Sequence, residues 1–132
     1  PYWQKHGMQL ASKMRFISAQ FEALLEDGLW IENGRHANEM AGRLHRAVRE
    51  LPFVEIAFPV QVNSVFARLP VELMEALQRE TFFWPWDERT GLARWMCAFD
   101  SEPQDIQRFV ETLLRLSPKV APGLDGSHPT GG

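Results

Sequence analysis

Segments of helical periodicity alternate with pairs of short apolar runs in this sequence, and that order limits the folds open to it. One pair of runs, rich in Val, Phe and Ile, occupies residues 53–58 and 63–69. A second pair occupies residues 82–86 and 92–99 and is separated by a five-residue polar loop that contains glycine. A loop of that length and composition is typical of a β-hairpin. The sequence therefore predicts two pairs of strands in an antiparallel sheet.

Apolar residues that recur three and four positions apart precede, separate and follow these strands. They predict helices over residues 9–25, 29–51, 70–80 and 101–116. The order helix, helix, strand, strand, helix, strand, strand, helix predicts an α+β fold, in which helices pack on a small antiparallel sheet. The first helix is long and precedes this small domain.

Local signals refine the element ends. Asp27 is expected to cap the second helix at a break marked by Gly28. Ser101 and Gln104 have the spacing of a capping box for the last helix. Pro85 indicates that the strand over residues 82–86 is an edge strand or carries a bulge. The domain boundaries that follow are residues 1–28 for the linking helix, 29–116 for the small domain and 117–132 for a disordered tail rich in Pro and Gly.

The composition excludes several classes of function. A net charge of -3 and a pI near 5.8 argue against nucleic-acid binding, which requires a basic face. The single cysteine, Cys97, forms no internal disulfide or zinc cluster, which is consistent with a reducing cytoplasm. No apolar run approaches the ~20 residues that cross a bilayer. His36 and His45 fall on opposite faces of one helix, so no metal site is expected, and the histidines are interpreted as surface residues.

Arg94 lies within the apolar run over residues 92–99. Strand alternation places it on one face with Leu92 and Met96, and places Trp95 and Cys97 on the other. A guanidinium among apolar neighbours requires an anion to offset its desolvation, and either the protein or a ligand supplies that anion. Its planar fork suits bidentate binding of a carboxylate.

Several segments, taken in order, resemble the low-specificity L-threonine aldolases, which are pyridoxal-phosphate lyases of the aspartate aminotransferase fold type. The resemblance reaches to about residue 116. It rests on PYWQKHGMQLASKMRFISAQ at residues 1–20, DGLW at 27–30, RHAN at 35–38, NSVFARLP at 63–70, LARWMC at 92–97 and FD at 99–100.

The resemblance implies a C-terminal fragment of a homo-oligomeric enzyme, a dimer or tetramer joined through the N-terminal helix. That enzyme cleaves L-threonine, L-allo-threonine and similar β-hydroxy-α-amino acids to glycine and an aldehyde. Arg94 matches the arginine that holds the α-carboxylate of the amino-acid substrate, and Lys5 and Lys13 match cations near the cofactor phosphate. The lysine that forms the Schiff base lies upstream of residue 1 in that family. The chain therefore contains no catalytic residue and is expected to be inactive alone.

Two alternatives remain open. The chain is also consistent with the small domain of another enzyme of the same fold type, an aminotransferase or a β-eliminating lyase, in which an arginine on the same strand binds a carboxylate. It is also consistent with a non-catalytic module that dimerises through its first helix and its aromatic strand.

Overall fold

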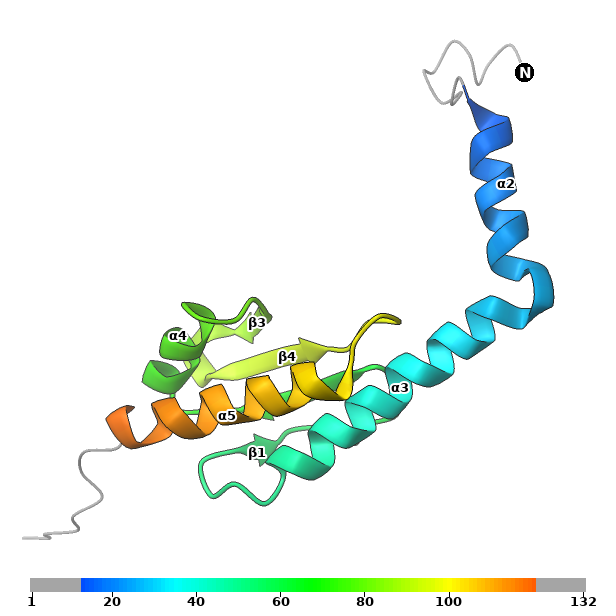
Figure 1. Ribbon diagram of the computed structural model, residues 1–132. Helices are drawn as coiled ribbons and strands as arrows, with labels where there is room; N and C mark the ends of the chain where they lie inside the picture. Colours follow the sequence, from blue (N-terminus) through cyan, green and yellow to red (C-terminus); the bar gives the residue numbers. More distant parts are fainter. Residues whose placement is uncertain (1–12, 121–132) are drawn as a thin grey trace, which may run out of the picture. The chain divides into compact units, whose positions relative to one another are not determined.

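The structure is a computed structural model, and it describes residues 13–120. Figure 1 shows the elements: α2 (Met14–Leu25), η1 (Glu26–Gly28), α3 (Leu29–Val48), β1 (Glu55–Ile56), β2 (Ser64–Arg68), α4 (Val71–Gln78), β3 (Trp84–Asp87), η2 (Glu88–Thr90), β4 (Leu92–Met96) and α5 (Pro103–Val120). The chain divides into two compact units, Pro1–Arg35 and His36–Gly132, so the division lies within α3. The predicted boundary at residue 28 lies earlier, at η1.

The second unit is built on a four-stranded sheet in which every strand pairs antiparallel, in the order β1-β2-β4-β3. This confirms the predicted α+β fold. Strand β3 lies at the edge, and its pairing with β4 is interrupted by a register shift between Pro85 and Asp87. The prediction that this strand is an edge strand or carries a bulge is therefore confirmed, because a residue that cannot donate a ladder hydrogen bond is tolerated at an edge and beside a bulge.

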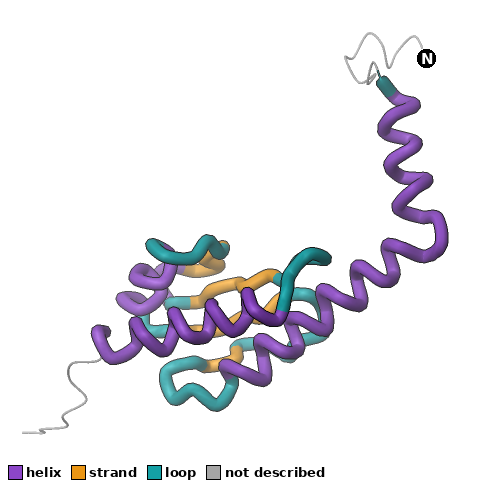
Figure 2. The backbone as a smooth tube through the Cα atoms, in the orientation of Figure 1, coloured by secondary structure: helices purple, strands orange, loops and turns teal. Residues whose placement is uncertain are grey.

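One face of the sheet carries the hydrophobic core. Val65 and Ala67 on β2, with Ala93 and Trp95 on β4, point toward it and are buried. Helices α3, α4 and α5 complete this core, and Figures 1 and 2 show α3 and α5 lying in front of the strands. The Trp95 ring packs edge-on against Phe109 of α5, with ring centroids 5.0 Å apart. The core residues from the three helices are Met40, Ala41, Leu44, Val48, Leu73, Met74, Leu77, Leu113 and Leu116.

Strand β1 is much shorter than the predicted run over residues 53–58. Only Glu55 and Ile56 pair with β2, and Ala57 adds one backbone hydrogen bond to the carbonyl oxygen of Phe66. Pro52 and Pro59 flank this segment, and neither can donate to a ladder. The strand is consequently limited to the residues between them.

The break between α2 and α3 is made by backbone geometry. Asp27 has φ 52° and Gly28 has φ 73°, so two successive residues adopt the left-handed region before α3 begins. No side-chain hydrogen bond from Asp27 caps α3 among the described residues, and the predicted capping role is not borne out. Asp and Gly are among the residues that enter this region at low cost, which explains the break.

The capping of α5 is displaced by one residue from the predicted capping box. The backbone N–H of Glu102 donates to the carboxylate of Asp105, 2.9 Å away, and Pro103 occupies the first helical position. The Ser101 hydroxyl instead accepts from the N–H of Ala98. Helix α5 continues to Val120, past the predicted end of the domain at residue 116, and the rest of the predicted tail, 121–132, lies outside the described residues.

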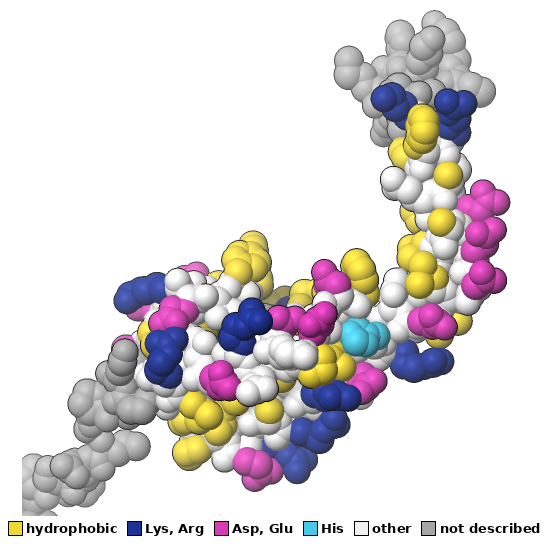
Figure 3. Space-filling model, in the orientation of Figure 1, with side chains coloured by type: hydrophobic (Ala, Val, Ile, Leu, Met, Phe, Trp, Pro, Cys, Tyr) yellow, Lys and Arg dark blue, Asp and Glu magenta, His cyan; other side chains and the backbone are white. Residues whose placement is uncertain are grey.

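Helix α2 presents the apolar side chains that its periodicity predicts, and they are exposed within the described structure. Figure 3 shows hydrophobic side chains along α2 with acidic side chains beside them. Among residues 13–120, no helix combines the length and hydropathy that spanning a bilayer requires. The exposed apolar side chains on α2 are Met14, Phe16, Ile17, Phe21, Leu24 and Leu25.

Candidate functional site

Strand β4 positions Arg94 on the sheet face opposite the hydrophobic core. Trp95 and Ala93 are buried in the core, whereas Met96 is 57% exposed and Arg94 is half-buried. The alternation predicted from the sequence is therefore confirmed for this strand. Arg94 is the Cα partner of Phe66 on β2 and of Trp84 on β3, so it lies near the middle of the outer face.

The guanidinium of Arg94 is held on three sides by neutral groups. Its Nε donates a long hydrogen bond of 3.4 Å to the hydroxyl of Ser64, a buried residue. Its Cζ lies 5.8 Å from the ring centroid of Phe66 and 5.9 Å from that of Trp86. The two Nη atoms form no hydrogen bond with any residue between 13 and 120. Both donors at the end of the fork are therefore available to a ligand.

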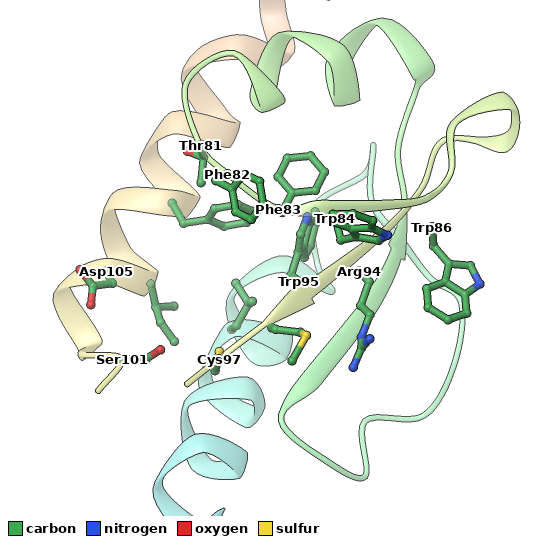
Figure 4. A pocket seen from close by; sticks show the side chains of 14 residues that line it. Thr81, Phe82, Phe83, Trp84, Trp86, Arg94, Trp95, Cys97, Ser101 and Asp105 are labelled. Carbon is green, nitrogen blue, oxygen red and sulfur yellow. The ribbon is translucent and has the colours of Figure 1, made fainter. Parts of the chain in front are cut away.

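No carboxylate within the described part of the chain pairs with Arg94. Arg68, on the same sheet face, does form an ion pair, with Nη1 2.8 Å from Oε1 of Glu55. Asp105 lines the cavity beside Arg94, but it accepts from the N–H of Glu102, and Figure 4 shows it on the opposite side of the cavity. The anion that Arg94 requires could come from the protein or from a ligand. Residues 13–120 of the protein do not supply it.

A cavity of about 600 Å³ opens beside Arg94. The pairing of β3 with β4 reaches only to Arg94. The residues of β4 after Arg94 therefore have no neighbour from β3, and the cavity lies there. Its wall is mainly aromatic and aliphatic, with one guanidinium, a combination that suits a small organic acid. The lining residues are Leu44, Thr81, Phe82, Phe83, Trp84, Trp86, Arg94, Trp95, Met96, Cys97, Ser101, Asp105, Ile106 and Phe109.

Two core residues that line this cavity have buried polar groups. The indole Nε1 of Trp95 has no hydrogen-bond partner among the described residues. Burial raises the pKa of the Cys97 thiol, so this thiol is protonated at neutral pH and is a poor nucleophile. This agrees with the prediction of an inert buried cysteine.

Lys5 and Lys13 are the other predicted site residues. Lys5 lies outside the described residues. Lys13 is the N-cap residue of α2, in the unit before residue 36, and its side chain makes no hydrogen bond or ion pair within the described part of the chain. Among the residues that the structure describes, no lysine lines the cavity. The residues that line the cavity therefore do not by themselves fit a pyridoxal-phosphate site, which requires a lysine for the Schiff base and groups for the phosphate.

His36 differs from the expectation of a surface histidine. Nε2 of His36 lies 2.8 Å from the carbonyl oxygen of Ser101, so His36 links α3 to the loop before α5 and is more than a surface residue. Within residues 13–120, no group of three His, Cys, Asp or Glu side chains is placed to bind a metal ion.

Sequence reasoning identified Arg94 but missed the residues that surround it. Ser64, Phe66 and Trp86 come from two other strands, and only the register of the sheet brings them to the guanidinium. The sequence signals for these neighbours were the apolar run at 63–69 and the aromatic run at 82–86. Neither run shows which of its residues lies opposite Arg94 in the sheet.

Comparisons with known proteins agree with the resemblance in the sequence. The chain is 43% identical over 112 residues to the low specificity L-threonine aldolase of Pseudomonas sp. (strain NCIMB 10558), and the match covers 85% of the chain and 32% of that relative. It is 38% identical over 112 residues to the low specificity L-threonine aldolase of Pseudomonas aeruginosa, with the same coverage. No protein-family model matches.

A solved structure of Leishmania major threonine aldolase has the same fold over much of the chain. Its TM-score is 0.62 with 31% sequence identity, and the match covers 74% of this chain and 29% of that one. The chain thus spans about a third of the length of the curated relatives it matches.

Proposed function

We propose that this chain is a portion of a low-specificity L-threonine aldolase, namely the C-terminal portion of a pyridoxal-phosphate-dependent aldolase. The whole enzyme would cleave L-threonine, L-allo-threonine and related β-hydroxy-α-amino acids to glycine and an aldehyde. One observation carries this proposal: Arg94 lines an apolar cavity, and within the described residues its two Nη atoms form no hydrogen bond and no carboxylate pairs with it.

Arg94 binds the α-carboxylate of the amino acid in this proposal. A carboxylate placed opposite the two Nη atoms accepts two parallel hydrogen bonds, which fix its direction as well as its distance. Fixing the carboxylate restricts rotation of the amino acid about its Cα, and this orients the bond that is to break. The contribution of this chain to catalysis is therefore positioning.

In this proposal the cofactor is held mainly by the part of the enzyme that this chain does not span. Pyridoxal phosphate supplies the electron-accepting ring on which this class of lyase depends. We assign Lys5 and Lys13 to the phosphate or to the entrance of the site, as the family resemblance implies. The amino-acid substrate, the homo-oligomer and a cytoplasmic location belong to the same proposal.

Two observations bear on the alternatives. A guanidinium that binds a carboxylate would serve an aminotransferase or a β-eliminating lyase equally well. The exposed apolar side chains on α2 suit a dimerisation module. The identity of 43% to an L-threonine aldolase favours the aldolase over both.

Assay of the full-length protein separates these functions. An aldolase releases acetaldehyde from L-threonine and forms glycine in equal amount, and its bound cofactor absorbs visible light. Visible absorbance without release of acetaldehyde would favour another enzyme of the fold type. Absence of both visible absorbance and acetaldehyde release would favour the dimerisation module.

A further inference from the structure

The aromatic rings that surround Arg94 have no part in the proposed function as stated. Phe66 and Trp86 each lie within the distance of about 6 Å at which a guanidinium interacts with the face of an aromatic ring. They come from different strands, β2 and β3, so Arg94 on β4 contacts one ring from each neighbouring strand. Such an arrangement limits the planes that the guanidinium can adopt.

The rings also support each other. Phe66 and Trp86 pack edge to face, with centroids 5.3 Å apart and planes at 88°. Phe58 packs edge to face against Phe66, with centroids 5.5 Å apart and planes at 85°. Edge-to-face contacts at these distances are favourable. The three rings therefore form a connected aromatic cluster, and Trp86 does not depend on Arg94 alone for its position.

Ser64 selects which edge of the guanidinium remains free. An arginine can present two pairs of donors to a carboxylate, either Nε with one Nη or the two Nη atoms together. The hydroxyl of Ser64 accepts from Nε and lies on a residue that is only 3% exposed. With Nε engaged, the pair of Nη atoms is the one left for a ligand.

We propose that Ser64, Phe66 and Trp86 are positioning residues for Arg94, with Trp86 as the most accessible of the three. They hold the guanidinium in one plane, with its two Nη atoms directed at the carboxylate, before the amino acid arrives. This inference rests on the proposed role of Arg94 as the carboxylate anchor. It adds that the anchor is pre-organised, so that less conformational entropy is lost on binding.

The test uses the full-length enzyme with its cofactor and measures the Kd of glycine by titration calorimetry, together with the KM and kcat for L-threonine. Trp86 is 56% exposed, so its replacement leaves the core intact. Trp86→Leu is expected to raise the Kd about three- to tenfold. The KM should rise by a similar factor, with a smaller change in kcat. Trp86→Phe, which retains an aromatic face, should restore most of the affinity.

Two control experiments test whether the effect of Trp86→Leu depends on Arg94. Phe99→Leu removes another exposed ring, which neither contacts Arg94 nor lines the cavity, and it should leave the Kd unchanged. In an Arg94→Leu background, Trp86→Leu should have no further effect, because the group that it positions is absent.

These measurements distinguish a failure of the positioning role from a failure of the carboxylate anchor. If Arg94→Leu weakens glycine binding but Trp86→Leu does not, the positioning role is wrong and the carboxylate anchor stands. If Trp86→Leu weakens binding equally with and without Arg94, Trp86 acts through another group, which also overturns the proposal. If Arg94→Leu leaves the Kd of glycine unchanged, both the anchor and its positioning residues are wrong.

Discussion

Gly91 approaches Leu69 so closely that a Cβ atom on Gly91 would collide with the carbonyl oxygen of Leu69. Gly91 also has φ 67°, and its carbonyl oxygen accepts from the N–H of Leu69 at 2.9 Å. The turn that leads into β4 is therefore built against the end of β2. Because Arg94 follows three residues later on β4, this contact helps to set the position of the candidate site.

Replacement of Gly91 by alanine should destabilise the protein strongly. The added methyl group meets a backbone oxygen and the φ value disfavours any side chain, so a loss of about 3 kcal/mol or more in the free energy of unfolding is expected. Chemical denaturation of the full-length protein measures this loss. Gly34→Ala is the matched control, because a Cβ there meets open space within α3, and it should stabilise by up to about 1 kcal/mol. Equal effects of the two substitutions would contradict the close contact.

The sequence was sufficient for the features that depend on local periodicity. Alternation along residues 92–96 separates Arg94 from Trp95, because successive side chains of a strand point to opposite faces. The surroundings of Arg94 depend on which residues of β2 and β3 lie opposite it, and that register is set by packing between segments distant in the sequence. The bulge after Pro85 shifts it further. For this reason Trp86 was not predicted as a neighbour of Arg94.

The cap of α5 was missed for a different reason. Two overlapping sets of residues, beginning at Ser101 and at Glu102, both offer a polar side chain three positions later. The structure uses Glu102 with Asp105, because Pro103 is suited to the first helical position and Ser101 is engaged with Ala98. Sequence spacing alone does not choose between them.

Cys97 should be unreactive in the folded protein. Its side chain is buried and its pKa is raised above the ordinary value, so the reactive thiolate is scarce and inaccessible. Alkylation by iodoacetamide, followed by mass spectrometry of the peptide that contains Cys97, should be at least about tenfold slower in the native protein than in urea. A raised pKa also means that the unfolded state loses the thiol proton first. The contribution of this group to stability is therefore present at neutral pH and decreases as the pH rises above about 9. Rapid alkylation at neutral pH in the native protein would show that Cys97 is accessible.

The isolated chain should self-associate through α2. The side chains of Ile17 and Phe21 are exposed on one apolar face of that helix, and burial of such a face is favourable. Sedimentation velocity at increasing concentration should show oligomers, and Phe21→Glu should shift them toward monomer. Ala19→Glu adds the same charge on the other side of the helix and should have less effect. A clean monomer at high concentration, before any substitution, would oppose this expectation.

The 132-residue chain alone should neither form a Schiff base with pyridoxal phosphate nor cleave L-threonine. The family resemblance places the required lysine upstream of residue 1. Borohydride reduction in the presence of the cofactor, followed by mass spectrometry, should give no stoichiometric adduct on Lys5, Lys13 or Lys119. A single stoichiometric adduct accompanied by aldehyde release would show that the chain is catalytically complete.

The most direct measurement of the central claim is kcat/KM for L-threonine in the full-length enzyme with Arg94→Leu. Loss of a bidentate anchor that leaves a charge unpaired costs about 3–5 kcal/mol. That corresponds to a decrease of roughly two to four orders of magnitude in kcat/KM. Arg94→Lys should recover only part of the loss, because an ammonium group lacks the planar fork.

Arg68→Leu is the matched control for this measurement, because it removes a guanidinium from the same sheet face that already has a carboxylate partner in Glu55. Its kcat/KM should stay within a few-fold of the unsubstituted enzyme, since exposed ion pairs contribute little. The account predicts a large loss for Arg94→Leu with visible cofactor absorbance retained, and a small one for Arg68→Leu. Near-normal turnover by Arg94→Leu, or its failure to fold, would show that Arg94 is a structural residue and does not bind the substrate.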